Sequence, residues 1–487
     1  MVVRCRLLLL LLLSCLVSPA ARATVRLPAL VGSHMVLQRD QPLRLWGWAG
    51  PGEAVRLTFR GHSYAASAPD AGGRWQAALP ASPAGGPYTL TVAGQNTIVL
   101  DDVLVGDVWL AAGQSNMQFK VKDRNPRGYQ PVRNADQEIA NAGYPAIRLF
   151  TVAQVAAARP AAEVAGSGWQ VCSSATVADF SAVAYFFGRE IHQRYHVPVG
   201  LVVSSWGGTP AEAWVSAEGL RAFPEFGPPI AQFAQPDSSR RDEQLRPTAL
   251  YNGMVAPLRP VALKGIIWYQ GETNVGRAGQ YRTLFPALIA DWRAQWGAPL
   301  PFLFVQLANF EAAQPAPTES AWAELREAQA GALVLPGTGM ATAIDVGEAD
   351  DIHPHDKQAV GHRLALAARR VAYGDKHVVA GGPTYADMTV AGATVRLTFT
   401  CAGSGLAAKN GQPLQGFALA GPDRVFHWAT ARLAGDDVLV GSPMVPTPVA
   451  VRYDWADNPA GNLTNQEGLP AVPFRTDAWP GLSAGRK

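Results

Sequence analysis

The chain has little cysteine and, after its first residues, no long hydrophobic run. Only 4 of the 487 residues are cysteines, and Cys5 and Cys15 lie in the apolar N-terminal segment. The other two, Cys172 and Cys401, are too far apart in sequence for a metal motif or a disulfide framework. They could pair across domains or remain isolated buried thiols. We therefore expect neither a fold built on disulfides nor a helix that spans a membrane.

Charge of either sign is also scarce. Charged residues make up 16% of the chain and hydrophobic residues 48%, as in globular proteins of two or three domains. The formal net charge of +3 resides in residues 1–23, which hold three arginines and no acidic group. Without that segment the chain is neutral and has no electrostatic basis for binding nucleic acid or an anionic membrane.

The first 23 residues predict a secretory signal peptide. Two arginines precede an apolar run from Leu7 to Leu13, and Ala21-Arg22-Ala23 supplies a small-x-small cleavage site. We expect cleavage after Ala23 and a protein that is secreted or periplasmic. Cys15 after Leu-Leu-Ser leaves a second possibility open, a lipoprotein cleavage site that would tether the protein.

The pattern of apolar residues predicts three domains of an α/β protein. Short alternating segments in residues 24–102 are typical of a small antiparallel β-sandwich. Strands and amphipathic helices alternate in residues 103–374, which requires a parallel sheet covered by helices on both faces. Residues 375–487 return to the β pattern and predict a second small β domain. The clearest expected strands are 43–48, 199–205, 265–269 and 301–307, and the clearest helices are 180–195, 279–296, 322–330 and 354–373, with Pro354 in the first turn of the last helix.

The turn Gly113-Gln114-Ser115-Asn116 follows an apolar strand and offers a candidate nucleophile. Open α/β sheets bind their ligands at the carboxyl ends of their strands, so Ser115 would be presented at the functional edge. The turn is not the Gly-x-Ser-x-Gly elbow of the α/β-hydrolases. A serine in such a turn can also simply cap the next helix, so the turn alone does not decide its role.

A serine needs a base to take its proton, and His353 in Asp351-Ile352-His353-Pro354 is the candidate. Asp351 is preferred as the residue that orients the histidine, and Asp350 and Asp345 are the alternatives. His353 could instead be a helix-start residue bonded to carbonyls. The aspartates and histidines of this segment are residue types that can bind a metal ion. The sequence has no second group of such residues at a suitable spacing, so we expect no catalytic metal.

Acyl transfer also needs donors that stabilise the oxyanion. The candidates are the backbone N–H groups of Ser115 and Gly208 and an amide side chain, with Gln270 preferred to Asn274. A glycine at position 208 lets the backbone approach the substrate closely. These turns each follow a separate strand of one sheet and would converge at one edge.

Two carboxylates offer an alternative reaction. Glu272 and Glu212 could serve as the acid pair of a glycosidase, because that chemistry needs two carboxyl groups that flank the bond. The alternative leaves Ser115 and His353 without a role, so the esterase interpretation is preferred.

Four blocks resemble the motif blocks of the sialate O-acetylesterase family, a branch of the SGNH hydrolases, and occur in that family's order. The blocks are Gly113–Met117, Trp206–Trp214, Trp268–Asn274 and Asp351–Pro354. The resemblance covers nearly the whole chain after residue 23. It implies an SGNH-type α/β/α sandwich flanked by small β-sandwich domains, and hydrolysis of O-acetyl esters on sugars without a cofactor.

The resemblance also implies roles for single residues. Ser115 would be the nucleophile, His353 the base and Asp351 its orienting residue, with Ser115, Gly208 and Gln270 forming the oxyanion site. The usual third block carries an asparagine in a Gly-x-Asn setting, whereas this chain has Gln-Gly-Glu from Gln270 onward. That difference leaves the identity of the third donor open.

The substrate side is less defined by sequence. Trp206 and Asn274 are expected to contact the sugar, and the tryptophans beside the motifs could form a sugar platform or belong to the core. Those tryptophans are Trp109, Trp206, Trp214 and Trp268. An acetylated sialic acid would need an arginine for its carboxylate, for which Arg277, Arg246 and Arg259 are candidates, whereas acetylated xylan or xyloglucan would not. A secreted carbohydrate-binding protein with an inert Ser115 is the remaining alternative.

Overall fold

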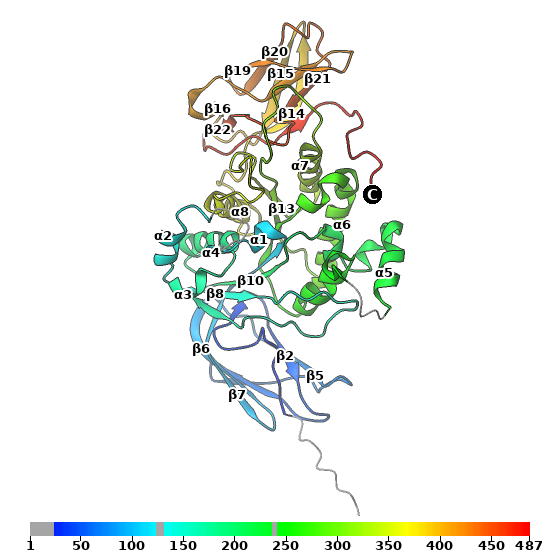
Figure 1. The fold of residues 1–487 in the computed structure, drawn as a ribbon. Coiled ribbons are helices and arrows are strands. Elements are labelled where there is room, and N and C mark those ends of the chain that lie inside the picture. The colour runs from blue at the N-terminus through cyan, green and yellow to red at the C-terminus, as the bar shows by residue number, and fades with distance from the viewer. Residues whose placement is uncertain (1–23, 123–130, 236–240) are drawn as a thin grey trace, which may run out of the picture.

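The computed structural model describes residues 24–122, 131–235 and 241–487 (Figure 1). The predicted signal peptide, residues 1–23, lies outside these ranges. A β domain from the start of the chain lies at one end of the molecule, an α/β domain forms the middle, and a second β domain lies at the other end.

The α/β domain is built on one sheet with the strand order β13-β12-β11-β7-β10-β8-β9. The neighbouring strands from β13 through β8 pair in parallel, and β9 pairs antiparallel at the edge. The strands of this sheet are β7 (Thr97–Gly113), β8 (Tyr144–Thr151), β9 (Gln170–Cys172), β10 (Val199–Ser205), β11 (Gly265–Tyr269), β12 (Phe302–Gln306) and β13 (Thr338–Thr342).

Alternate residues of β12 show that helices cover both faces of the sheet. Phe302 and Phe304 contact Phe285 of α6, with ring centroids 6.1 and 5.0 Å apart. Leu303, which points the other way, lies by α8, since a Cβ placed on Gly339 would be 3.1 Å from Leu303 and 3.2 Å from Ala367. The α/β/α sandwich with a parallel sheet is therefore confirmed. The helices of this domain are α1 (Ser115–Gln118), α2 (Ala135–Ala140), α3 (Ser174–Val177), α4 (Ala182–Tyr195), α5 (Gly227–Phe233), α6 (Ala278–Trp296), α7 (Ala321–Gly331) and α8 (Lys357–Val371).

Strand β7 belongs to two domains at once. Its first part pairs antiparallel with β6 of the N-terminal β domain, and from Asp107 onward it pairs in parallel with β10 and then β11. The domain boundary expected between residues 102 and 103 thus falls within a continuous strand. The other strands of the N-terminal domain are β1 (Val36–Gln38), β2 (Leu43–Trp48), β3 (Arg56–Phe59), β4 (His62–Ala65), β5 (Arg74–Leu79) and β6 (Gly85–Ala93).

The C-terminal β domain has two four-stranded sheets, β14-β15-β20-β19 and β18-β17-β21-β23, and a short pair β16-β22. Their inner faces enclose a separate apolar core that includes Val395, Leu419 and Val451. The strands are β14 (Thr384–Ala391), β15 (Thr394–Thr400), β16 (Leu406–Ala408), β17 (Phe417–Ala420), β18 (Phe426–Trp428), β19 (Thr430–Ala434), β20 (Asp437–Gly441), β21 (Ala450–Tyr453), β22 (Leu463–Asn465) and β23 (Phe474–Arg475).

The start of α8 differs from the prediction. The helix begins at Lys357, because the Asp356 side chain accepts a hydrogen bond from the Ala359 N–H at 2.9 Å and caps the helix. The expectation that Pro354 lies in the first turn of this helix is therefore wrong. His353 and Pro354 instead lie in the loop between β13 and α8.

Cys172 and Cys401 are both free thiols, the first buried and the second exposed. The disulfide alternative is excluded, and the burial expected for an isolated Cys401 is wrong. Within the described ranges, none of the helices has the length and apolar composition needed to cross a membrane.

Candidate active site

Ser115 lies where β7 ends and the chain turns sharply into α1. Gly113 has φ of 139°, and a Cβ at this position would lie 2.1 Å from the Tyr269 carbonyl oxygen of β11. Only glycine permits this backbone conformation and close approach. The Gln114 N–H donates to the same carbonyl at 2.9 Å, so the turn is anchored to the neighbouring strand. Ser115 is half-buried, at the carboxyl end of the central strand.

The turn after β10 lies directly against Ser115. A Cβ on Gly207 would be 3.2 Å from the Cβ of Ser115, and the Gly207 N–H donates to Gln118 Oε1 at 2.7 Å. Gly208 is exposed, with φ of 72°. No described residue accepts a hydrogen bond from the Gly208 N–H. Of the two glycines, Gly208 has the backbone donor that can serve a ligand.

His353 is held by Asp351 in the loop before α8. Asp351 Oδ1 lies 3.1 Å from His353 Nδ1 and accepts the His353 backbone N–H at 2.8 Å, and both side chains are buried. Asp351 Oδ2 lies 3.3 Å from His355 Nε2, so two histidines fix the carboxylate. Of the two alternative aspartates, Asp350 is exposed, and Asp345 pairs with Arg363 at 2.6 Å.

The segments that carry Ser115 and His353 adjoin each other. Asn116 Nδ2 donates to the Ile352 carbonyl at 3.1 Å, and the Phe119 and His353 rings lie 5.6 Å apart between centroids. The serine turn and the histidine loop are therefore neighbours at the carboxyl edge of the sheet.

Asn116 is the centre of a buried network that the sequence analysis missed. Its Nδ2 donates to Glu272 Oε1 at 2.6 Å, and its Oδ1 accepts from Lys357 Nζ at 2.5 Å. Lys357 is fully buried, with its ammonium 4.9 Å from the Phe119 ring centroid. Burial raises the pKa of Glu272 above its ordinary value. A lysine at the start of a helix is normally exposed, so its residue type did not predict that Lys357 is buried. Asn116 of the serine turn was the signal in the sequence that pointed to this network.

Gln270 and Asn274 form hydrogen bonds with the turn that follows β10. Gln270 Nε2 donates to the Thr209 carbonyl at 3.2 Å and to Asn274 Oδ1 at 2.7 Å. These bonds occupy both amide hydrogens, so Gln270 must rearrange before it can donate to an oxyanion. Asn274 is buried, accepts from the Ala211 N–H at 2.9 Å and donates to Glu212 at 3.1 Å. Asn274 therefore stabilises the segment after β10 through its hydrogen bond with Ala211.

The two carboxylates of the glycosidase alternative serve other partners. Glu212 pairs with Arg277 at 2.8 Å, and Glu272 bonds Asn116. Neither Glu212 nor Glu272 is exposed to act as one of the two acids that a glycosidase needs, which argues against glycoside hydrolysis. No group of three or more histidine, cysteine, aspartate or glutamate residues in the described ranges is placed to hold a metal ion.

Most of the tryptophans beside the motifs belong to the core. Trp109, Trp214 and Trp268 are fully buried, and Trp268 packs edge-on against Trp214 with ring centroids 5.9 Å apart. The suggestion that these three form a sugar platform is wrong. Trp206 is half-buried in the turn after β10 and is the one of the four that reaches the surface.

Two of the candidate arginines line one pocket. Arg246 and Arg277 contribute to a pocket of about 470 Å³ that also includes Glu212. The charge of Arg277 is compensated by its ion pair with Glu212. Arg259 lines a different pocket and donates to Gln295 at 2.8 Å.

This fold, with a half-buried serine at the carboxyl end of the central strand and an aspartate-bound histidine on the adjoining loop, defines an ester hydrolase of the SGNH type. Comparison with known proteins agrees. The family described as "Carbohydrate esterase, sialic acid-specific acetylesterase" has a sequence model that matches residues 105–370. The chain belongs to this family of carbohydrate esterases and is a carboxylic ester hydrolase.

Similar proteins cover most of the chain. Rat sialate O-acetylesterase is 33% identical over 436 residues, which are 77% of this chain and 79% of the rat protein. The human sialate O-acetylesterase is 32% identical over 399 residues, covering 74% and 73% of the two chains. The crystal structure of a carbohydrate acetylesterase from Xanthomonas citri matches with a TM-score of 0.85 at 43% identity, covering 94% of this chain and 100% of that one.

Proposed function

We propose that the protein removes O-acetyl groups from sugars through an acetyl-serine intermediate on Ser115. The observation that supports this most directly is that the loop carrying His353 is bound to the serine turn. Asn116, the residue after Ser115, donates a hydrogen bond to the Ile352 carbonyl of this loop, and Asp351 orients His353 within it. Membership in the carbohydrate esterase family supports the same reaction class.

In the proposed mechanism His353 removes the Ser115 proton while Oγ attacks the acetyl carbonyl. The backbone N–H groups of Ser115 and Gly208 stabilise the oxyanion of the tetrahedral intermediate. His353 returns its proton to the sugar oxygen as the ester bond breaks, which leaves an acetyl-enzyme. A water molecule, activated by the same histidine, then releases acetate. Asp351 keeps the imidazole in the orientation and tautomer that both steps require.

Substitutions test these roles. Ser115→Ala should lower kcat/KM for p-nitrophenyl acetate by about 10⁴-fold or more, and Asp351→Asn by about 10²-fold or more. Asp350→Asn is the matched control, because Asp350 is exposed and one residue away; its kcat/KM should stay within about twofold of the parent. Unchanged turnover by the Ser115→Ala protein would instead support a binding protein with background esterolysis.

The sugar is tested by acetate release from acetylated sialosides, xylo-oligosaccharides and xyloglucan fragments, with the Ser115→Ala protein as the blank. The names of the rat and human relatives favour a sialoside. Of the candidate arginines in this pocket, Arg246 is available to a sialoside carboxylate, since Arg277 already pairs with Glu212. If sialosides are the substrate, Arg246→Ala should raise KM for sialosides alone. An unchanged KM would favour the neutral glycans.

Secretion is part of the proposal and rests on the signal-like pattern of residues 1–23. Expression of the full chain should yield a mature protein that begins at Thr24, as measured by intact mass. A lipid-modified product that begins at Cys15 would favour the tethered alternative.

A further inference from the structure

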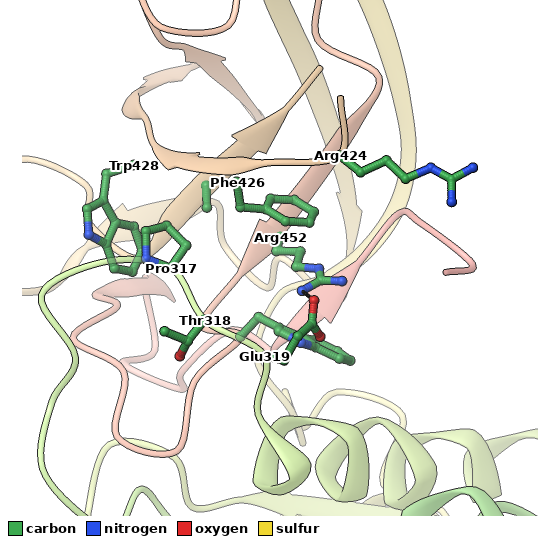
Figure 2. Close-up of a pocket in the computed structure, with 10 residues that line it drawn as sticks. Pro317, Thr318, Glu319, Arg424, Phe426, Trp428 and Arg452 are labelled. Carbon is green, nitrogen blue, oxygen red and sulfur yellow. Dashed lines mark hydrogen bonds and ion pairs between the residues drawn. The ribbon is translucent and has the colours of Figure 1, made fainter. Parts of the chain in front are cut away.

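A groove lies between the C-terminal β domain and the loop that follows β12. It consists of two pockets of about 200 and 340 Å³ that share Gly416, Trp428 and Trp455, and Figure 2 shows the smaller of the two. Residues 313–319 of the loop form one wall, and β18 with the segment 454–460 forms the other. The volume of the larger pocket is within the range of small-ligand sites.

Trp428 offers an apolar ring at the mouth of this groove. Its side chain is 46% exposed, which is unusual for a residue of this size. The indole N–H donates to the Pro315 carbonyl at 2.9 Å. This bond fixes the orientation of the ring and satisfies its one polar group, so the remaining exposed surface is apolar. A fixed indole face is suited to stacking against the C–H face of a sugar ring.

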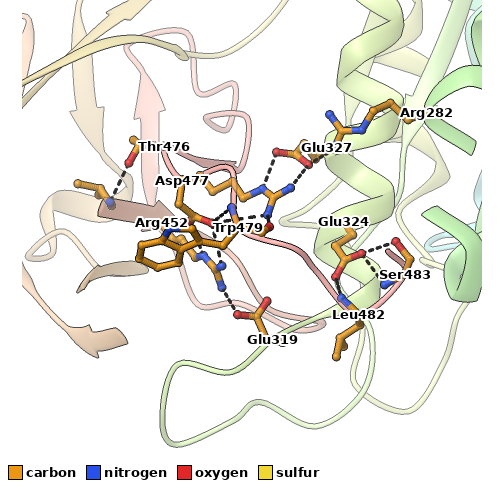
Figure 3. A network of polar contacts seen from close by, with 12 residues as sticks. Arg282, Glu319, Glu324, Glu327, Arg452, Thr476, Asp477, Trp479, Leu482 and Ser483 are labelled. Atoms are coloured by element: carbon orange, nitrogen blue, oxygen red, sulfur yellow. Dashed lines mark hydrogen bonds and ion pairs between the residues drawn. The ribbon is translucent and has the colours of Figure 1, made fainter. Parts of the chain in front are cut away.

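The charges around the groove suit a neutral ligand. Arg452 is 4% exposed and donates to Asp477 at 2.9 and 3.2 Å and to Glu319 at 2.8 Å, so its charge is compensated (Figure 3). Arg424 also lines the smaller pocket, but Figure 2 shows its guanidinium pointing away from the other lining residues. Neither arginine is placed to bind a phosphate or a carboxylate of a ligand.

The walls of the groove are held in place before any ligand binds. Ser320 Oγ donates to Asp457 Oδ1 at 2.7 Å, and Asn458 Nδ2 donates to the Glu311 carbonyl at 2.6 Å. These bonds tie both ends of the 311–320 loop to the C-terminal domain. A preformed site binds without the cost of ordering its own loops.

We propose that this groove is a second saccharide-binding site, which takes a neutral sugar unit by stacking on Trp428. The site does not involve Ser115 and so extends the protein beyond deacetylation: it would hold a glycan chain through unmodified sugar units.

The test uses the full chain with Ser115→Ala and deacetylated xylo-oligosaccharides and xyloglucan fragments as probes, measured by isothermal titration calorimetry. Adding Trp428→Ala should weaken binding by about tenfold or more, while Trp428→Phe should retain most of it. The matched control, Met444→Ala, changes a 67% exposed residue of the same domain and should bind as the parent does. Trp206→Ala, at the tryptophan beside Ser115, measures how much of the binding belongs to the catalytic site. Thermal unfolding of each variant checks that the fold is retained.

Three results would overturn the proposal. The first is that no neutral saccharide binds at millimolar concentration. The second is that Trp206→Ala removes binding while a folded Trp428→Ala protein binds normally, which would place all binding at the catalytic serine. The third is that a proline-rich peptide occupies the groove in place of saccharides, since aromatic grooves also accept such peptides. Acetate release by the parent enzyme is measured separately, so a negative result for this groove does not decide whether the proposed esterase activity is correct.

Discussion

The N-terminal β domain shares a strand and an apolar core with the α/β domain, whereas the C-terminal β domain has its own core and is attached mainly through polar side chains. On the N-terminal side, β7 is continuous and one core cluster extends from Val25 to Ala368; of the C-terminal domain, this cluster includes only Val472 among its buried residues. On the C-terminal side, Glu327, which Figure 3 shows, pairs with Arg475 at 2.9 Å. Fully buried Arg326 of α7 donates to the Ala456 and Asp457 carbonyls.

The difference shows two ways of fixing a domain. An apolar junction stabilises through the area it removes from water and cannot be opened without exposing the core of both partners. A polar junction adds little net stability, but its hydrogen bonds set one orientation and respond to salt and pH. We therefore expect the N-terminal domain to unfold together with the catalytic domain and the C-terminal domain to respond separately.

The largest effect should come from a charge placed in the apolar junction. Val36 of β1 is 4% exposed, in register with Leu104 of β7, and packs where a Cβ on Gly200 would be 2.9 Å away. Val36→Asp should lower the free energy of unfolding by about 4 kcal/mol or more and abolish esterase activity. Urea denaturation followed by circular dichroism measures this.

Val99→Asp is the matched control, because Val99 lies on the same β7 strand and is 52% exposed. It should change the free energy of unfolding by no more than about 0.5 kcal/mol. A Val36→Asp protein that loses only the N-terminal domain and keeps turning over p-nitrophenyl acetate would contradict the shared-core interpretation.

The second effect concerns pH and the C-terminal domain. Burial raises the pKa of Asp454 from an ordinary 3.8 to about 7, with Arg326 acting in the opposite direction. The folded state then binds a proton that the unfolded state has lost, so this group makes stability fall as pH rises from about 4 to about 7. The loss is on the order of 4 kcal/mol at most. Asp454→Asn should flatten this part of the stability profile, as measured by urea denaturation at pH 4.5 and 7.5.

Asp387→Asn, an exposed residue of the same domain, should leave the pH profile unchanged. An Asp454→Asn protein with the parent's pH slope would show that the carboxyl titrates normally in the folded state.

The third effect tests the ion pairs of the polar junction. Glu327 accepts two hydrogen bonds from Arg475, at 2.9 and 3.1 Å, and one from Arg282. Glu327→Gln should lower the free energy of unfolding of the C-terminal domain by about 1–2 kcal/mol. The loss should be smaller in 1 M salt, because the Debye length there is only about 3 Å and screening weakens the Glu327–Arg475 ion pair of the parent protein.

Glu218→Gln provides the comparison, since the Glu218–Arg221 pair is exposed and should contribute almost nothing. A Glu327→Gln loss that is independent of salt would mean that packing, and not charge, holds this junction.

The smallest effect links the C-terminal domain to the catalytic loop. Asn458 Oδ1 accepts from Asn309 at 2.7 Å, and Asn309 Oδ1 accepts from the Gly347 N–H at 2.7 Å, next to Glu348, which pairs with His355. Asn458→Ala should lower kcat for p-nitrophenyl acetate by about threefold through a looser His353 loop. A kcat equal to that of the parent would show that the loop is held by the α/β domain alone.

Much of the fold could be predicted from local sequence. The strands at 43–48, 199–205 and 265–269 match β2, β10 and β11 to the residue, because apolar runs of that length between glycine-rich turns have few other stable conformations. The helix at 279–296 differs from α6 by one residue. The end of the serine strand was equally visible, since Gly113 is needed where β7 meets the Tyr269 carbonyl.

The errors share a physical cause. Pro354 is a favourable first-turn residue, yet Asp356, two residues later, caps the helix. Trp109 and Trp268 lie beside motifs in sequence, but alternation along β7 and β11 turns them toward the helix-covered faces of the sheet. Trp214 lies in a short helix, Ala211–Trp214, and is buried against Trp268. Lys357 and Glu272 look solvated by type, but both meet at Asn116 below the surface.

The sequence by itself determined the order and type of most elements and pointed to Ser115 and His353 as candidates, because local apolar periodicity and turn chemistry depend on neighbouring residues alone. Only the tertiary structure decided which aspartate lies at His353, that both amide hydrogens of Gln270 are already used, and that a lysine is buried beside the serine turn. The buried lysine gives the physical reason: Lys357 and Asn116 are 241 positions apart and meet only when the parallel sheet forms, and no local pattern specifies such a contact.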